Sequence, residues 1–197
     1  MKNLLLLLLF FACAEASAQR FTVLSGKLEN LKGIAAYNIT FDYKGLEVNG
    51  FASEAAYLEE KVGKRQNYSD GGQKAQKFEQ DWYADREGKY EPAFIEYFNK
   101  RFEKGEVKVL RDPSQKYTMT VKTTWVYPGY ALAQVEPAKI SAVITIAETA
   151  NPANVLVALE FDKSIGVVKD KRDQGDRIAG AYERLAKNLT IQLKRFL

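Results

Sequence analysis

The chain of 197 residues contains no histidine and a single cysteine, Cys13. Without histidine, and without cysteine beyond its N-terminal segment, the chain cannot form a Ser-His-Asp triad, a cysteine nucleophile or a histidine-ligated metal site. No glycine-rich loop of the phosphate-binding kind follows a predicted strand. The sequence therefore predicts no catalytic residue, no cofactor, no cofactor-binding residue and no metal ligand, and we interpret the protein as a non-enzyme.

An excess of charge of one sign is also absent. The 29 basic and 25 acidic residues give a net charge of +4, and the two signs are interleaved along the chain. Such a balance supports solubility and lacks the basic stripe that nucleic-acid-binding proteins carry. We therefore expect no nucleic-acid partner.

Long hydrophobic runs are absent except at the N-terminus, where Leu4 to Ala12 follow the basic residue Lys2. The small residues Ala16-Ser-Ala18 come next, as in a signal-peptide cleavage site before Gln19. The apolar run is far shorter than the roughly 20 residues of a membrane-spanning helix. We expect residues 1–18 to be a signal peptide and the mature chain to be exported, periplasmic or secreted, with no transmembrane segment.

Cys13 raises an alternative, because an acylated cysteine near the N-terminus would anchor a bacterial lipoprotein. The lipoprotein signal prefers a leucine-like residue three positions before the cysteine and a small residue two before it. Here these positions are Phe10 and Phe11. We favour cleavage after Ala18 and keep a lipid-anchored accessory protein as an alternative.

Residues 19–197 predict a single α+β domain, whose core must hold it together without disulfides. Its centre is a meander of three antiparallel strands at 117–127, 138–149 and 155–162, in which alternate residues are apolar. The side chains predicted to face the core are Tyr117, Met119, Val121, Trp125, Tyr127, Ile140, Ala142, Ile144, Ile146, Val155, Val157, Leu159 and Phe161. Two N-terminal strands at 21–28 and 34–43 and a short strand at 107–110 complete an antiparallel or mixed sheet.

Helices are expected to cover the apolar face of this sheet. Ser53 is predicted to cap the first, and the second is expected over residues 74–87. Between them, the polar stretch 64–73 contains two adjacent glycines and predicts a mobile loop. Pro92 fits the first turn of a third helix that ends at Lys104.

The last helix is predicted to be the main cover of the sheet. Asp176 is expected to cap it after a charged loop over residues 166–175. Apolar side chains then recur every three or four residues, as on the buried face of an amphipathic helix: Ile178, Tyr182, Leu185, Leu189, Leu193 and Phe196.

The connection between the first two meander strands, residues 128–137, is unusually long and apolar for a hairpin loop. It contains Pro128, Gly129, Tyr130, Leu132 and Val135. An apolar loop in an exported protein either folds back over the core or contacts a partner. We treat these five residues as the candidate interaction loop, with an envelope protein or a small apolar ligand as its partner.

Carboxylates are the remaining source of chemistry. A carboxylate-dependent hydrolase would require two acids that meet in space, and no spacing in the sequence favours a particular pair. Asp170, Asp173 and Asp176 beside Gly175 suggest a calcium loop, but their spacing is not that of an EF-hand. The hydrolase stays an alternative, distinguished by a cavity that holds two carboxyls with raised pKa values.

Short motifs across the chain resemble those of a family of uncharacterised exported bacterial proteins. They are Val23-Leu-Ser-Gly26, Phe41-Asp-Tyr43, Glu91-Pro92, Phe98-Asn99, Tyr117, Val121-Lys-Thr-Thr124, Pro128-Gly129, Glu148-Thr-Ala-Asn-Pro152, Arg177-Ile178 and Ala181-Tyr182. The predicted element order is also similar to that of the curli-secretion channel protein and of the N-terminal domain of the Tol-system periplasmic protein. This resemblance implies a non-catalytic role in envelope assembly or protein interaction.

Overall fold

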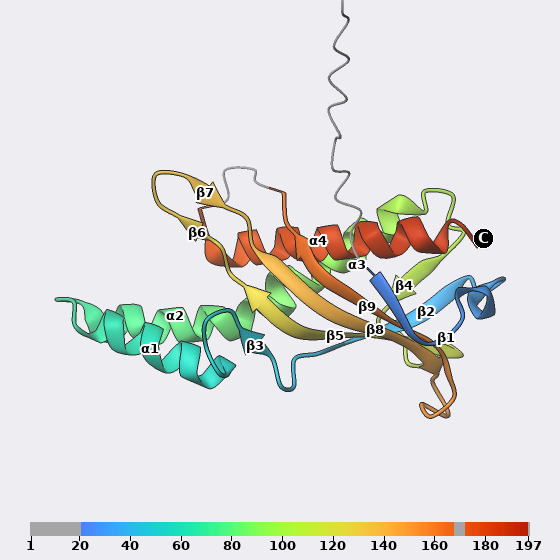
Figure 1. The fold of residues 1–197 in the computed structure, drawn as a ribbon, viewed down its shortest axis with the longest axis horizontal. Helices are drawn as coiled ribbons and strands as arrows, with labels where there is room; N and C mark the ends of the chain where they lie inside the picture. The colour runs from blue at the N-terminus through green and yellow to red at the C-terminus, as the bar shows by residue number, and fades with distance from the viewer. Residues whose placement is uncertain (1–20, 168–171, 197) are drawn as a thin grey trace, which may run out of the picture.

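The computed structural model describes residues 21–167 and 172–196 (Figure 1). The predicted signal peptide, its cleavage site and Cys13 lie outside these residues. Within them, no helix combines the length and the apolar character that a membrane span requires.

The described residues form an α+β fold, as the sequence predicts. The strands are β1 (Phe21–Gly26), β2 (Ala36–Asp42), β3 (Glu47–Val48), β4 (Lys108–Leu110), β5 (Tyr117–Tyr127), β6 (Tyr130–Ala131), β7 (Val135–Glu136), β8 (Lys139–Glu148) and β9 (Val155–Ile165). The helices are η1 (Leu28–Leu31, 3-10), α1 (Glu54–Gln66), α2 (Gly71–Asp85), η2 (Arg86–Tyr90, π), α3 (Glu91–Arg101) and α4 (Gln174–Leu193).

Seven strands form one mixed sheet in the order β1-β9-β8-β5-β2-β4, with β3 beside β5. β5, β8 and β9 pair antiparallel, which confirms the predicted meander. β2 pairs parallel with both β4 and β5. The two N-terminal strands therefore lie far apart, with β9, β8 and β5 between them.

The core lies between this sheet and α4. Met119, Ile144 and Leu159 are fully buried, as are Leu185 and Leu189 on the facing side of α4. All five belong to one cluster of buried apolar side chains. The predicted packing of the last helix on the meander is therefore confirmed.

Three of the residues predicted to face the core are wrongly placed, because the strands are irregular. A bulge between Thr123 and Trp125 inserts an extra residue into β5 and reverses the alternation beyond it. Val126 is consequently buried, whereas Trp125 and Tyr127 are half-buried. On β9, Val155 is exposed, beyond the register shift at Ile146/Ala147.

The second and third predicted helices form one nearly continuous helical path. α2, the π-helical turn η2 and α3 follow one another without a loop between residues 71 and 101. Pro92, in the first turn of α3, cannot donate a backbone hydrogen bond to the preceding turn, which accounts for the wider turn upstream. The predicted end at Lys104 is too late, since α3 ends at Arg101.

The predicted loop over residues 64–73 is also too long. α1 extends to Gln66 and α2 begins at Gly71, so the connection contains only residues 67–70. A Cβ atom on Gly71 would lie 2.3 Å from the carbonyl oxygen of Arg65. This glycine therefore permits close packing of two helices, where the sequence suggested a mobile loop.

Of the two predicted helix caps, Ser53 is confirmed and Asp176 is wrong. The Ser53 hydroxyl accepts a hydrogen bond from the Ala56 amide, 3.1 Å away, and caps α1 as predicted. α4 is capped by Asp173, whose carboxylate accepts from the Asp176 amide at 3.0 Å. Asp176 instead lies in the first turn, where its charge favours the helix dipole.

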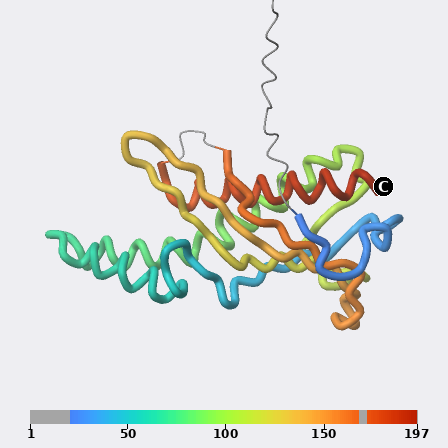
Figure 2. The backbone as a smooth tube through the Cα atoms, in the orientation of Figure 1, coloured from blue at the N-terminus to red at the C-terminus, as the bar shows by residue number. Residues whose placement is uncertain are grey.

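Two projections leave the sheet–helix body near the end at which α4 begins (Figures 1 and 2). One is the hairpin of α1 and α2, called here the helical hairpin. The other is residues 128–137 with β6 and β7, called here the ribbon.

Candidate interaction site

The predicted interaction loop folds as a short two-stranded ribbon that extends the β5–β8 pair beyond the sheet (Figure 1). β6 and β7 pair antiparallel, Tyr130 with Glu136 and Ala131 with Val135. Strands of two residues are too short for an alternation pattern, so the sequence could not predict them.

The base of the ribbon is held by two close contacts. Pro128 is buried, and its carbonyl oxygen accepts a hydrogen bond of 3.2 Å from Nε of the buried Arg177 on α4. Gly129 has a φ of +67°, and a Cβ atom there would lie 2.3 Å from the carbonyl oxygen of Glu136. The chain can turn into the ribbon at this point only with glycine.

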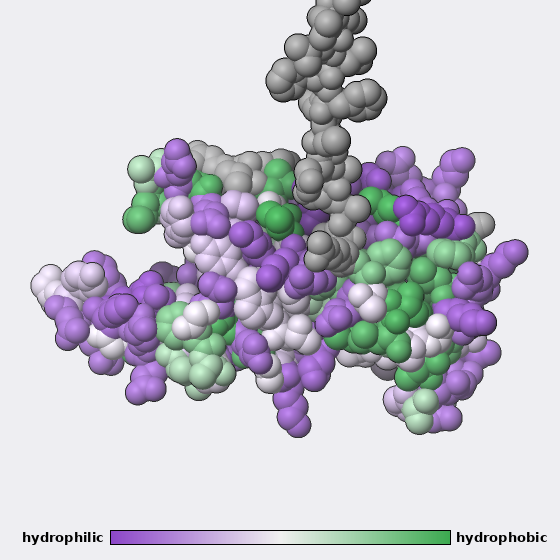
Figure 3. Space-filling model, viewed as in Figure 1, coloured by the Kyte–Doolittle hydropathy of each residue, from purple (hydrophilic) through white to green (hydrophobic). Residues whose placement is uncertain are grey.

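The projecting part of the ribbon carries exposed apolar side chains. Leu132 is 76% exposed and Tyr130 is 46% exposed, whereas Val135 is half-buried. Figure 3 shows hydrophobic colour at this tip. The structure thus separates the five candidate residues, with Pro128 and Gly129 forming the base and the other three forming the projecting part.

Two apolar residues that the sequence analysis missed lie next to the start of β8, where the chain leaves the ribbon. Ile165 and Val167 are both exposed. Ile165 pairs with Lys139 at the start of β8, and the Gly166 amide donates to the Ala138 carbonyl oxygen at 2.9 Å. Their proximity to the ribbon follows from the register of β9 on β8, which sequence spacing does not reveal.

A polar contact braces one side of the ribbon. The Tyr127 hydroxyl donates to Oε2 of Glu136 at 2.8 Å, and Nζ of Lys139 lies 5.1 Å from the centroid of the Tyr127 ring. Burial, together with the hydrogen bond to Glu136, raises the pKa of Tyr127 to about 12. Tyr127 therefore stays a neutral hydrogen-bond donor at physiological pH.

A second group of polar side chains lies under the π-helical turn η2. The ring of Tyr90 stacks on that of Tyr182 at 5.4 Å, and the Tyr182 hydroxyl shares a hydrogen bond with Thr123. Among the described residues, the buried Tyr90 hydroxyl has no hydrogen-bond partner. Tyr90 lines a cavity of about 10 Å³, which holds at most one water molecule.

The phenols of Tyr90, Tyr182 and the half-buried Tyr43 all have raised pKa values. Burial raises the pKa of Tyr182 to about 12 and raises the pKa values of Tyr43 and Tyr90 further. All three phenols are consequently protonated at neutral pH. The cavity beside them is also far smaller than the sites that bind small molecules.

Among the described residues, two carboxyls, Asp85 and Glu91, have raised pKa values, and each forms an ion pair with a different basic side chain. Burial raises the pKa of Glu91, although the Arg111 guanidinium and the Tyr43 hydroxyl lower it in part. Burial likewise raises the pKa of Asp85, although Lys89 opposes the change. Since Glu91 pairs with Arg111 and Asp85 with Lys89, the geometry lends no support to a hydrolase that uses these two carboxyls as a pair.

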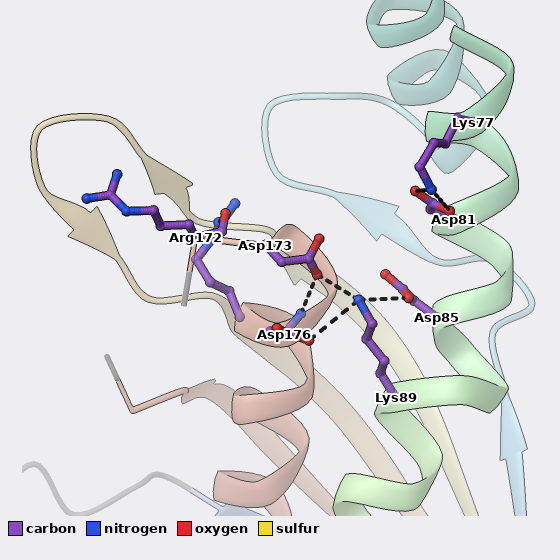
Figure 4. A network of polar contacts seen from close by, with 8 residues as sticks. Lys77, Asp81, Asp85, Lys89, Arg172, Asp173 and Asp176 are labelled. Atoms are coloured by element: carbon purple, nitrogen blue, oxygen red, sulfur yellow. Dashed lines mark hydrogen bonds and ion pairs between the residues drawn. The ribbon is translucent and has the colours of Figure 1, made fainter. Parts of the chain in front are cut away.

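The aspartates of the suggested calcium loop surround a lysine (Figure 4). Nζ of Lys89 lies 2.7 Å from Asp173, 3.1 Å from Asp85 and 3.5 Å from Asp176. Asp170 lies outside the described residues. The ammonium group of Lys89 thus occupies the position that a cation would take between Asp173 and Asp176.

Comparison with known proteins gives no family for this chain. No protein-family model matches it. The search of curated proteins gave no match either. Among solved structures, a PelC dodecamer from Paraburkholderia phytofirmans is similar over 85% of this chain and 97% of that chain, with 8% identity and a TM-score of 0.33. A similarity of this level carries no argument about function.

Proposed function

We propose that this chain is an exported, non-catalytic bacterial envelope protein that binds a protein partner through the ribbon. The observation that carries the proposal is Leu132, a large apolar side chain that is 76% exposed at the tip of a ribbon with a fixed base. Exposed apolar groups of this kind become favourable when a partner covers them. A base held by Arg177 and Gly129 also lowers the conformational entropy lost on binding.

The neighbouring residues enlarge the proposed contact surface. Tyr130 supplies a ring of the type enriched at interface centres, and Ile165 and Val167 continue the apolar character beside the ribbon. A protein partner can cover side chains that project from a surface in this way. A small apolar ligand would need an enclosed cavity, and the ribbon residues are exposed on a projection.

Export supports an envelope location for this binding. The basic start, apolar core and small-residue cleavage motif before Gln19 are those of a signal peptide. Mass spectrometry of the protein recovered from its host should find Gln19 at the N-terminus. An acylated Cys13 would instead establish the lipid-anchored alternative and place the chain on a membrane.

Site-specific photo-crosslinking in the native host tests the proposed surface. A photoreactive amino acid replaces Leu132 in one variant and Leu24, which is 52% exposed on β1, in a matched control. We expect a discrete crosslinked protein band from position 132 and none from position 24. Identical products from both positions, or none from position 132, would contradict the proposal.

A second variant separates binding from folding. In a pull-down without a crosslinker, Tyr130→Ser combined with Leu132→Ser should abolish capture of the partner that crosslinking identified, while leaving the thermal unfolding midpoint unchanged. If this variant lost as much stability as a core substitution, the ribbon would be packing on the body and the proposed surface would not be free to bind.

A further inference from the structure

The outer half of the helical hairpin concentrates positive charge. Residues 61–77 contain five basic side chains, namely Lys61, Lys64, Arg65, Lys74 and Lys77, and one acidic side chain, Asp70. This segment carries a net charge of +4, although Glu60 and Asp81, just outside it, pair with Lys64 and Lys77. Figure 2 shows it at the far end of a projection, away from the sheet and α4.

Four residues of this segment form a shallow cleft. Lys64, Arg65, Tyr68 and Lys74 line a volume of about 410 Å³ where α1 ends and α2 begins. Arg65 is held in place, since its guanidinium lies 3.8 Å from the centroid of the Phe78 ring and Nη1 donates to the Lys61 carbonyl oxygen at 2.9 Å. Three cations thus converge on one open surface.

The existing ion pairs of the two lysines leave them available to a stronger anion. Lys64 lies 2.5 Å from Glu60, and Lys74 lies 2.8 Å from Asp70, each pair separated by one helical turn. Both lysine side chains nevertheless remain more than half exposed. Exposed pairs of this type are weak and screened by salt, so a dense array of phosphates competes with them.

An aromatic side chain lies beside the cations. Tyr68, in the connection between α1 and α2, is 66% exposed. Tyrosine is enriched where proteins meet the boundary between lipid headgroups and acyl chains, because its ring is apolar and its hydroxyl is polar. A free phosphate would use the cations of the cleft and leave Tyr68 without a role, whereas a lipid surface uses both.

We propose that the outer end of the helical hairpin docks on an anionic phospholipid surface. Lys64, Arg65 and Lys74 bind the headgroup phosphates, and Tyr68 inserts its ring between neighbouring headgroups. This surface is separate from the ribbon, so the proposal goes beyond the binding of a protein partner and can fail or succeed independently of it.

Vesicle co-sedimentation tests this proposal with the purified protein, whose intact mass is measured first so that an acyl chain on Cys13 cannot account for binding. We expect binding to vesicles of phosphatidylethanolamine with phosphatidylglycerol and no binding to phosphatidylcholine alone. Raising sodium chloride from about 0.05 to 0.5 M should release the protein, because screening at high salt weakens attraction between exposed charges. Binding to both vesicle types alike would overturn the proposal.

Two matched pairs of variants assign the binding to the hairpin. Lys64→Gln with Lys74→Gln should weaken vesicle binding by about thirtyfold. Each basic residue near an anionic surface raises the affinity for that surface about fivefold. The control, Lys104→Gln with Lys194→Gln, makes the same charge change beside the end of α4, where these lysines are also exposed. An equal loss in the control would mean that net charge alone determines binding, and it would overturn the proposal.

The second pair tests the aromatic contact. Tyr68→Ser should weaken vesicle binding several-fold at constant salt, whereas Tyr83→Ser, an exposed tyrosine further along α2, should not. Sodium phosphate at the ionic strength of the chloride buffer should displace no more protein than the chloride does. Specific displacement by phosphate would show a site for a small anion and contradict docking on a lipid surface.

Discussion

The β5–β8 pair differs sharply between its two ends. Inside the sheet, Val121 of β5 and Ile144 of β8 lie opposite each other and are fully buried. Beyond Pro128 the same pair continues as the ribbon, where Leu132 is largely exposed. The helical hairpin repeats this contrast, with Tyr57 buried at its base and Tyr68 exposed at its end.

This contrast separates the residues that stabilise the fold from those that our proposals assign to binding. The buried apolar side chains under α4 account for stability, since each one removes a large apolar area from water. The ends of the projections make few contacts with the body, so their side chains stabilise the fold very little. Exposed side chains on a rigidly held base are instead suited to binding.

The largest expected effect lies in the body. Ile144→Ala should lower the free energy of unfolding by about 2–5 kcal/mol, because it leaves a cavity among fully buried side chains. Urea unfolding measures the change as a shift of the midpoint at constant slope. Val143→Ala, the neighbouring residue on the other face of β8, is half-buried and should cost clearly less. Equal losses from the two variants would mean that the helices do not cover the face that bears Ile144.

The helical hairpin offers a sharper test with two adjacent glycines. Gly71→Ala should destabilise the protein by about 1–3 kcal/mol, because the added Cβ would meet the carbonyl oxygens of Arg65 and Gln66. Gly72→Ala meets no atom within 4 Å and should stabilise the helix by up to about 1 kcal/mol. The pair is compared by thermal unfolding, and effects of the same sign would contradict the close packing of α1 on α2.

The start of α4 gives a smaller, pH-dependent effect. Partial burial raises the pKa of Asp173, but the hydrogen bonds from Lys89 and from the Asp176 amide outweigh burial and hold it below its usual value. A carboxyl whose pKa is lower in the folded state stabilises the protein above its unfolded pKa of about 3.9, and this contribution disappears as the pH falls through the folded pKa.

Asp173→Ala should therefore cost about 1 kcal/mol at neutral pH, the usual effect of removing a helix cap. The difference from the unaltered protein should shrink as the pH falls below about 4, which urea unfolding at several pH values measures. Asp176→Ala serves as the control and should cost less, since Asp176 does not cap the helix. The reverse order would restore the sequence-based prediction that Asp176 is the cap.

The sequence predicted the parts of the fold in which a long pattern repeats. β8 alternates regularly from Lys139 to Ile146, and α4 carries an apolar stripe over five turns, so Ile144 and Leu185 are correctly placed in the core. Local irregularities escaped prediction. The bulge after Thr123 turns Trp125 and Tyr127 to the other face of the sheet. A bulge adds one residue to a strand, and the alternation of apolar and polar residues does not reveal where this happens.

The candidate site could be predicted only as a stretch of chain. An apolar loop that is too long for a hairpin identified residues 128–137, but it could not reveal which of them project. That division depends on Arg177, which lies 49 positions from Pro128 and binds its carbonyl oxygen. Ile165 and Val167 are likewise brought to the ribbon by strand register. Contacts between distant segments depend on the completed fold, and local spacing does not encode them.

The smallest expected effect lies at the tip of the ribbon, and it decides how the contrast between body and projections is interpreted. Leu132→Ser should change the free energy of unfolding by less than about 0.5 kcal/mol, because a side chain that is 76% exposed loses almost no buried area on removal. Thermal unfolding beside Leu193→Ser, an apolar residue buried near the end of α4, provides the comparison. A large loss at position 132 would mean that Leu132 packs on the body in solution. A negligible loss of stability would mean that Leu132 has no structural role and stays exposed on a rigid base. Binding of a partner through the ribbon requires this.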